Sequence, residues 1–206
     1  MIAIAFAMLA GCAAPPRGGL RPADYLSAHG AIRAPAPERF SFCIDHGCAR
    51  VIPAKLEAAQ WKDVVKPLDL PAPDAKAERQ AVAAAVGRFE RVVRARLGVG
   101  PDRAGTYPGA FDADQNDCVD ETSNTTTLLL MLAADGRLRL HDVGPPAARG
   151  SFLDAAHPHR SATLVEHGTG ARFVVDSWFR PSGVAADVAP LERWQAGWTP
   201  DGGARS

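Results

Sequence analysis

The sequence lacks three features that would narrow its function at once: an excess of charge of one sign, a long apolar run and a cysteine-rich pattern. Its 23 Lys and Arg residues balance 23 Asp and Glu residues. This neutrality argues against a nucleic-acid partner, because nucleic-acid binders usually carry a basic excess. The apolar run at residues 2–10 is too short for a membrane span, which needs about 20 residues. What remains, 206 residues of which 47% are hydrophobic and 22% charged, suits one ordinary domain with a tail.

The N-terminal apolar run ends in LAGC, residues 9–12, which resembles a bacterial lipobox. In that motif the cysteine receives a lipid and becomes the new N-terminus once the signal peptide is cleaved. No Lys or Arg precedes the apolar run, unlike in the usual signal peptide, and an ordinary buried strand is the alternative. We expect a lipoprotein signal over 1–12 that ends at a lipidated Cys12, then a flexible tether rich in Pro and Gly over 13–37. The chain would then be lipid-anchored in the bacterial cell envelope, facing the periplasm.

The four cysteines divide by position. With Cys12 lipidated, Cys43 and Cys48 are close enough in sequence to form a disulfide in an oxidising periplasm. A metal site that includes His46 is the alternative, although no fourth ligand is evident nearby. The spacing is not the C-x-x-C arrangement of redox proteins. Cys118 is left unpaired, and an unpaired thiol in an exported protein needs a role, for which catalysis is one candidate.

Two long helices are the clearest predicted elements. The first follows Asp74, a residue type that caps helices, and its apolar residues form one stripe at positions 82, 86, 89, 93 and 97. Charged residues off this stripe, Glu90 and Arg94 among them, are expected in solvent. The second helix starts at Asn116 or Asp117 and runs to residue 134, where Asp-Gly ends it.

Three β signals follow the second helix. One alternating stretch covers 137–143, and two strands at 161–167 and 172–179 flank the compact turn GTGA, which predicts a hairpin. Helices followed by an antiparallel sheet predict an α+β fold. We expect a single domain over 38–200, with a tail at 201–206.

Cys118 lies at the predicted start of the second helix, inside an acidic stretch. Free N–H groups and the macrodipole there stabilise a thiolate, whereas the surrounding carboxylates disfavour it, so that a histidine beside the sulfur would decide. His159 opens one strand of the hairpin and Asp176 lies on the other, so the two are expected to be cross-strand neighbours. His157 is a rival base. His141, on a different strand, is expected to be structural.

These elements resemble the transglutaminase-like branch of the papain-like cysteine peptidases over about residues 80–180. The likeness is carried by QNDCVDE, PHRSATLVE and FVVDSW, and the chain is also similar to small proteobacterial lipoproteins of this type. The resemblance implies a core in which the helix with Cys118 packs on an antiparallel sheet that carries His159 and Asp176. It makes the cysteine the nucleophile, the histidine the general base and the aspartate the residue that holds the imidazole.

The resemblance implies further site residues as well. The Gln115 amide and the Cys118 backbone N–H are candidates for the oxyanion hole. Trp178 is a candidate residue of the substrate pocket, as part of its wall, and a place in the core is the alternative. The chain departs from the family at His159-Arg160, where alanine usually follows the histidine.

The acidic stretch also suggests a calcium site. Asp112, Asp114 and Asn116 match the first EF-hand ligand positions, but the register then fails, because Asp117 stands where glycine is needed. Some transglutaminase-like peptidases bind calcium near the cysteine, so Asp112, Asp114 and Asp120 are candidates in another geometry. Solvated carboxylates in loops and helix caps are the alternative. No other metal or cofactor is expected.

The sequence therefore favours a membrane-anchored, periplasmic and monomeric cysteine hydrolase or acyltransferase that acts on amide bonds of a peptide or protein. The alternative is a non-catalytic envelope lipoprotein that uses the same fold to bind a partner. A contact between the Cys118 sulfur and His159, whose other ring nitrogen faces Asp176, would favour the enzyme. A cysteine sealed in the core would favour the binding protein.

Overall fold

The computed structural model describes residues 19–106, 113–150 and 158–200. Cys12, Asp112, His157 and the expected tail lie outside these described residues. Among the helices of the described ranges, none combines the length and apolar character that a membrane crossing needs.

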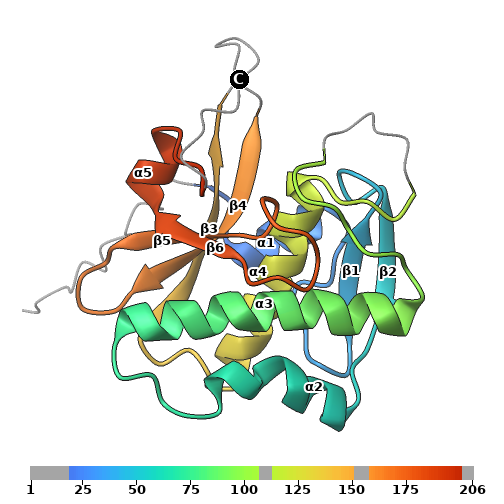
Figure 1. Cartoon of the computed structure of the whole chain (residues 1–206), viewed down its shortest axis with the longest axis horizontal. Helices are drawn as coiled ribbons and strands as arrows, with labels where there is room; N and C mark the ends of the chain where they lie inside the picture. The colour runs from blue at the N-terminus through green and yellow to red at the C-terminus, as the bar shows by residue number, and fades with distance from the viewer. Residues whose placement is uncertain (1–18, 107–112, 151–157, 201–206) are drawn as a thin grey trace, which may run out of the picture.

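The described chain mixes helices with antiparallel strands, which confirms the α+β class (Figure 1). Its helices are α1 (Pro22–Ala28), α2 (Ala58–Val65), the 3-10 turn η1 (Lys66–Leu68), α3 (Ala75–Leu97), α4 (Cys118–Ala134) and α5 (Leu191–Gln195). Its strands are β1 (Phe40–Ile44), β2 (Arg50–Ala54), β3 (His141–Arg149), β4 (His159–Glu166), β5 (Arg172–Asp176) and β6 (Asp187–Pro190).

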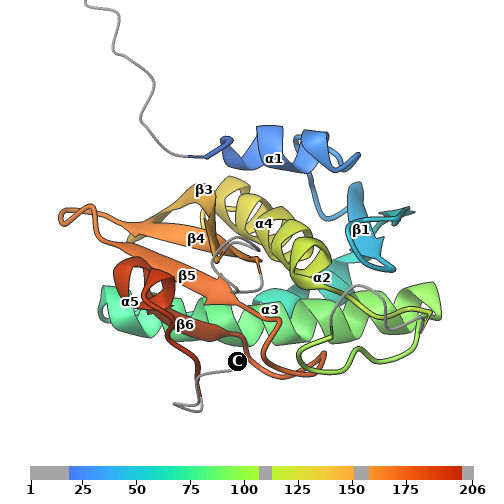
Figure 2. The same cartoon turned by 90° about the horizontal axis from the view of Figure 1, so that it is seen from above.

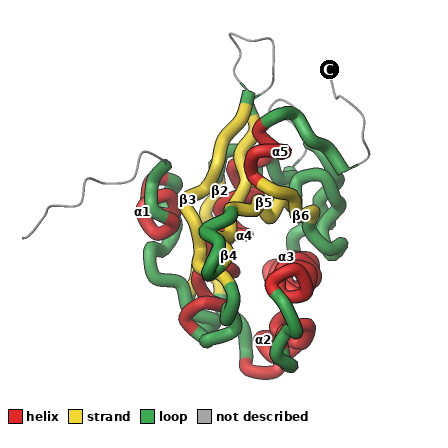
Figure 3. Tube along the Cα trace, turned by 90° about the vertical axis from the view of Figure 1, so that its left-hand side faces the viewer, coloured by secondary structure: helices red, strands yellow, loops and turns green. Residues whose placement is uncertain are grey.

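The strands form two sheets. β1 and β2 make a hairpin, and the other four form an antiparallel meander in the order β3-β4-β5-β6. One face of the meander packs on the main core, where Ala162 and Leu164 of β4 join side chains of α3 and α4. The opposite face packs on α5, where Val174 of β5 meets Leu191 and Trp194. Within this arrangement α4 lies between α1 and α3 (Figures 2 and 3).

Both long helices form close to their predicted ends, with α4 starting one or two residues later than expected. The Asp74 side chain accepts a hydrogen bond from the Ala77 N–H and so caps α3, as its residue type indicates. Asp117 caps α4, which places Cys118 as the first helical residue. The expectation of solvated charges on α3 is wrong for Glu90 and Arg94, each only 3% exposed. Arg94 donates to the carbonyls of Gly100 and Asp114, and Glu90 lies beside Glu121 of α4. Periodicity within α3 alone does not reveal these contacts.

The strands differ from the prediction at their ends. β3 begins at His141 instead of residue 137, because the preceding N–H groups of Arg139 and Leu140 donate to the Glu78 carboxylate instead of to a neighbouring strand. β4 starts at His159, as the placement of His159 at the opening of this strand predicts, and β5 ends at Asp176 instead of residue 179. β1 and β6 were not predicted.

The expected flexible tether is corrected over its second half. α1 forms within it, and Tyr25, Leu26 and Ala31 are buried in a cluster with Val51 and Leu130. The physical reason is the apolar Tyr-Leu pair, which has a helix face to bury against, so this segment belongs to the domain.

Candidate active site

The structure brings His159 and Asp176 together at one end of the sheet. The His159 Nε2 atom lies 2.7 Å from Asp176 Oδ2, and Trp194 Nε1 donates to the same oxygen at 2.8 Å. His159 and Asp176 are 6% and 2% exposed. The carboxylate therefore has two donors in a buried setting, and it orients the imidazole by its Nε2 atom.

Aromatic rings surround the imidazole. The ring centroids of Trp178, Phe179 and Trp194 lie 4.7, 5.4 and 5.4 Å from that of His159. The indole N–H of Trp178 donates to the Thr106 carbonyl at 2.8 Å, so this wall is held in one orientation. Packing against three aromatic rings restricts the imidazole.

Cys118 lies against the first residues of β4. Its sulfur is 3.9 Å from the Pro158 carbonyl oxygen, and the backbone N–H of Arg160 also interacts with the sulfur. The ladder between β4 and β5 begins only at Ala162, so the start of β4 lies outside that ladder. Cys118 is half-buried and is the free cysteine of the described ranges, so it is not sealed in the core.

No hydrogen bond joins the Cys118 sulfur to His159, although both residues are described. Alternation along β4 explains this. Ala162 and Leu164 face the core beneath α4, so His159 projects to the opposite face, where Asp176 meets Trp194 of α5. Cys118 and the His159–Asp176 pair therefore lie at the same end of β4 but on opposite faces of the sheet.

The thiol is neutral at physiological pH. Burial raises the pKa of Cys118 to about 11, and the carboxylates of Asp117 and Asp176 act in the same direction. The backbone N–H and the positive charge of Arg160 lower the pKa by less. The helix N-terminus was expected to stabilise the thiolate, but the cost of removing the charged sulfur from water is larger than this stabilisation.

The amide of Gln115 is engaged elsewhere. Its Nε2 atom donates to the Pro101 carbonyl at 3.1 Å, and its oxygen accepts from the Arg103 N–H at 3.0 Å. The oxyanion role expected from the resemblance is thus not supported for this side chain. At the start of α4 the Asp117 carboxylate accepts the Val119 and Asp120 N–H groups. The N–H of Cys118 itself has no partner among the described residues.

A buried polar network links the two halves of the site, and sequence reasoning missed it. Ser177, the residue after Asp176, donates to Glu121 of α4, and Asn116 donates to the other carboxylate oxygen of Glu121 at 2.6 Å. Glu90 of α3 packs beside Glu121, and burial followed by that neighbouring charge raises the pKa of Glu90 well above its usual range. The helix that starts at Cys118 is therefore bonded to the residue that follows Asp176.

The calcium candidates do not form a common site among the described residues. Asp114 pairs with Arg50 and accepts the Gly100 N–H. Asp120 accepts the N–H groups of Cys48 and Asp117. The acidic side chains are thus used as caps and loop contacts, which was the alternative.

Cys43 and Cys48 form the predicted disulfide, which takes up both sulfurs and removes them as metal ligands. The disulfide closes the turn between β1 and β2. Asn124 of α4 then bonds the backbone of Cys43 on both sides, with its Oδ1 atom accepting the N–H and its Nδ2 atom donating to the carbonyl, each at 2.8 Å. The hairpin therefore supports the first turns of α4.

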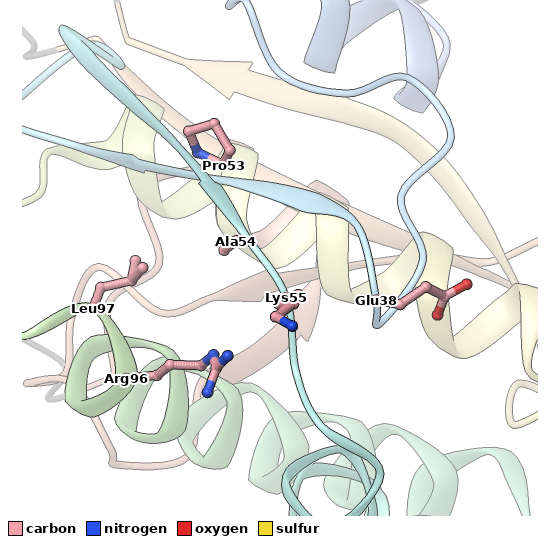
Figure 4. A pocket seen from close by; sticks show the side chains of 6 residues that line it. All are labelled: Glu38, Pro53, Ala54, Lys55, Arg96 and Leu97. Atoms are coloured by element: carbon pink, nitrogen blue, oxygen red, sulfur yellow. The ribbon is translucent and has the colours of Figure 1, made fainter.

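One surface hollow of about 580 Å³ is separate from this site (Figure 4). It lies between the hairpin and the C-terminal end of α3, and its lining residues are Glu38, Pro53, Ala54, Lys55, Arg96 and Leu97. None of the predicted site residues lines it.

His141, the other histidine on the sheet, is held by Glu78 and Arg79 and takes no part in the site, as expected. Comparison of the chain with protein-family models, curated proteins and solved structures gives no match.

Proposed function

We propose that the protein is a cysteine hydrolase or acyltransferase of transglutaminase-like type that acts on amide bonds, with Cys118 as nucleophile, His159 as base and Asp176 as its orienting partner. The observation that carries the proposal is the buried His159–Asp176 pair, at the strand end where the Cys118 sulfur lies. The buried Ser177–Glu121 bond, which ties α4 to the end of β5, supports it.

The chemistry follows from the occupied ring nitrogen. Because Nε2 of His159 is bonded to Asp176, Nδ1 is the atom that accepts the thiol proton. The sulfur then attacks the amide carbonyl carbon, and the Cys118 N–H stabilises the oxyanion. The carbon–nitrogen bond breaks, the amine leaves with the proton from His159, and a thioester remains. Water releases the acyl group in a hydrolase, and an amine releases it in a transferase.

The raised thiol pKa selects one form of this mechanism. With a pKa of about 11 for Cys118, the resting nucleophile is a neutral thiol. The thiolate is made by general-base catalysis during attack and not stored beforehand.

The test is alkylation of Cys118 by iodoacetamide at neutral pH, in the full chain carrying Cys12→Ala, with the modified peptide identified by mass spectrometry. We expect His159→Gln to slow the reaction at least about 10-fold, because general-base assistance contributes about 100-fold or more to such steps. The matched control is His141→Gln, a buried histidine of the same sheet that should leave the rate unchanged. Equal rates in all three proteins would overturn the proposal.

A second candidate is a non-catalytic envelope lipoprotein that binds a partner through the same surface. It is favoured by the missing bond between Cys118 and His159 and by the high thiol pKa. An alkylation rate indifferent to His159 would select it.

Both candidates share the proposed lipid anchor at Cys12. A palmitate analogue should label the chain in a bacterial host and should not label Cys12→Ala. Label that persists in the variant would exclude the anchor.

A further inference from the structure

The carboxylate of Glu121 joins two segments that each neighbour a proposed site residue. Its Oε1 atom accepts from the side-chain amide of Asn116 at 2.6 Å, and its Oε2 atom accepts from the Ser177 hydroxyl. Asn116 lies two residues before Cys118, and Ser177 directly follows Asp176. The two oxygens of one side chain therefore tie the start of α4 to the end of β5.

The same connection reaches the wall of the imidazole. The Thr106 hydroxyl donates to the Asn116 carbonyl, and the Trp178 indole N–H donates to the Thr106 carbonyl at 2.8 Å. The ring centroid of Trp178 lies 4.7 Å from that of His159. A displacement of Asn116 would thus move the ring that packs against the proposed base, as well as the helix that begins with the thiol.

Neutral donors hold the Glu121 carboxylate in place. Glu121, Asn116 and Ser177 are all buried, whereas Arg94, the buried arginine of α3, donates to backbone carbonyls. Burial, the neighbouring charge of Glu121 and a hydrogen bond to it raise the pKa of Glu90 well above its usual range. Glu90 therefore keeps its proton and adds a donor instead of a second negative charge. Hydrogen bonds to a carboxylate are strong and directional, so Glu121 fixes where its donors lie.

We propose that Glu121 is a positioning residue, which sets the distance between the Cys118 sulfur on α4 and the His159–Asp176 pair on β4 and β5. This role rests on the proposed function, because it requires His159 to act on Cys118. A displacement of about 1 Å by a change far from the chemistry can cost about 100-fold in rate. Loss of one of the two bonds to Glu121 should therefore remove the benefit of His159, although neither bond touches the sulfur or the imidazole.

The test measures how strongly Cys118 alkylation depends on His159 in each variant. The rate with iodoacetamide at neutral pH is determined with and without His159→Gln, in the full chain carrying Cys12→Ala. The ratio of these two rates is the His159 factor, which we expect to be at least about 10 in the parent. Ser177→Ala removes one donor, and Glu121→Gln leaves a single acceptor oxygen for two donors. Each should reduce the factor to below about 3, because the general base is then misplaced.

The variants separate positioning from packing. Glu121→Gln keeps the size and shape of the side chain, so a role in packing alone would leave the His159 factor unchanged. The matched control is Ser123→Ala, a buried serine of α4 whose hydroxyl donates to the Val119 carbonyl at 2.8 Å. It should keep the parent factor, and urea denaturation checks that each variant is folded.

The outcomes distinguish this proposal from the proposed function. A factor that falls in Ser177→Ala and Glu121→Gln but not in Ser123→Ala supports the positioning role. A parent factor that both variants retain overturns the positioning role and leaves the enzyme proposal standing, and so does an equal fall in Ser123→Ala. A parent rate indifferent to His159 overturns both proposals, because there would be no action of His159 to position.

Discussion

The sheet carries two buried histidine–carboxylate pairs, and they differ in what the second ring nitrogen does. His141 Nδ1 lies 2.8 Å from Glu78 Oε1 and His159 Nε2 lies 2.7 Å from Asp176 Oδ2, so the pairs look alike. The Nε2 atom of His141, however, faces Arg79 Nη1 at 3.0 Å. Arginine only donates, so both ring nitrogens of His141 are engaged and neither can accept a proton from a neighbouring nucleophile.

His159 has no described hydrogen-bond partner at Nδ1, and a thiol lies at the adjacent strand end. The comparison teaches that a buried His–carboxylate pair alone does not indicate catalysis. The free nitrogen and the nearby nucleophile distinguish the two ends of the sheet.

The largest expected difference is in stability. The Glu78 carboxylate accepts the backbone N–H groups of Arg139 and Leu140, each at 3.0 Å, in addition to His141. We expect Glu78→Ala to lower the free energy of unfolding by about 3–5 kcal/mol, because it leaves several buried donors without an acceptor. Urea denaturation measures this loss.

The matched variant at the His159 end of the sheet is Asp176→Ala, whose carboxylate accepts from the side chains of His159 and Trp194 and from no backbone N–H of the described residues. It should cost less stability than Glu78→Ala and should instead slow alkylation of Cys118. A larger loss in Asp176→Ala would mean that its role is structural and would remove the contrast between the pairs.

The second expected difference is in pH dependence. Around the start of α4, burial raises the pKa of Asp102 to about 7 and that of Asp120 to about 8. At the end of the sheet that carries His141, the hydrogen bond from Arg79 lowers the pKa of Glu166. The raised groups keep protons that the unfolded chain releases near pH 4, so their stabilisation is full below that pH and is lost as the pH rises through 7 to 8.

We therefore expect the free energy of unfolding to fall by several kcal/mol between pH 5 and pH 8, at about 1.4 kcal/mol for each pH unit over which one of these carboxyls keeps its proton. Urea denaturation at each pH measures this fall. Asp102→Asn should flatten this fall, and Glu166→Gln should leave it unchanged, because a lowered pKa titrates below the range. Stability that increases over the range would contradict the assignment of protonated carboxyls to this end.

The smallest expected effect concerns the indole N–H of Trp194, which donates to the carboxylate of the His159–Asp176 pair. Trp194→Phe removes the 2.8 Å hydrogen bond to Asp176 and keeps most of the apolar ring. It should cost about 1 kcal/mol of stability, the usual net contribution of one hydrogen bond, and should slow Cys118 alkylation a few-fold. Trp198→Phe, which changes the half-buried ring beside Phe179, is the control and should stay within about 0.5 kcal/mol of the parent.

Much of this fold is readable from local chemistry. The apolar stripe of α3 and the capping residues Asp74 and Asp117 predict the long helices because they act within one turn of chain. β1 escapes this reading, since all five of its residues are buried and it shows no alternation. α1 escapes it as well, because its seven residues depend on contacts with Val51 and Leu130, far along the chain.

The candidate site likewise has features that local sequence predicts and features that depend on tertiary packing. The sequence by itself determined the start of α4 to within about two residues, the disulfide of Cys43 and Cys48, and the placement of His159 and Asp176 on neighbouring strands, because spacing and turn residues set these relations. Only the tertiary structure decided that Glu90 and Arg94 are buried and that the thiol pKa is raised. It also decided that His159 and α4 occupy opposite faces of the sheet. Burial and facing depend on which elements pack together, and no short stretch of sequence contains that information.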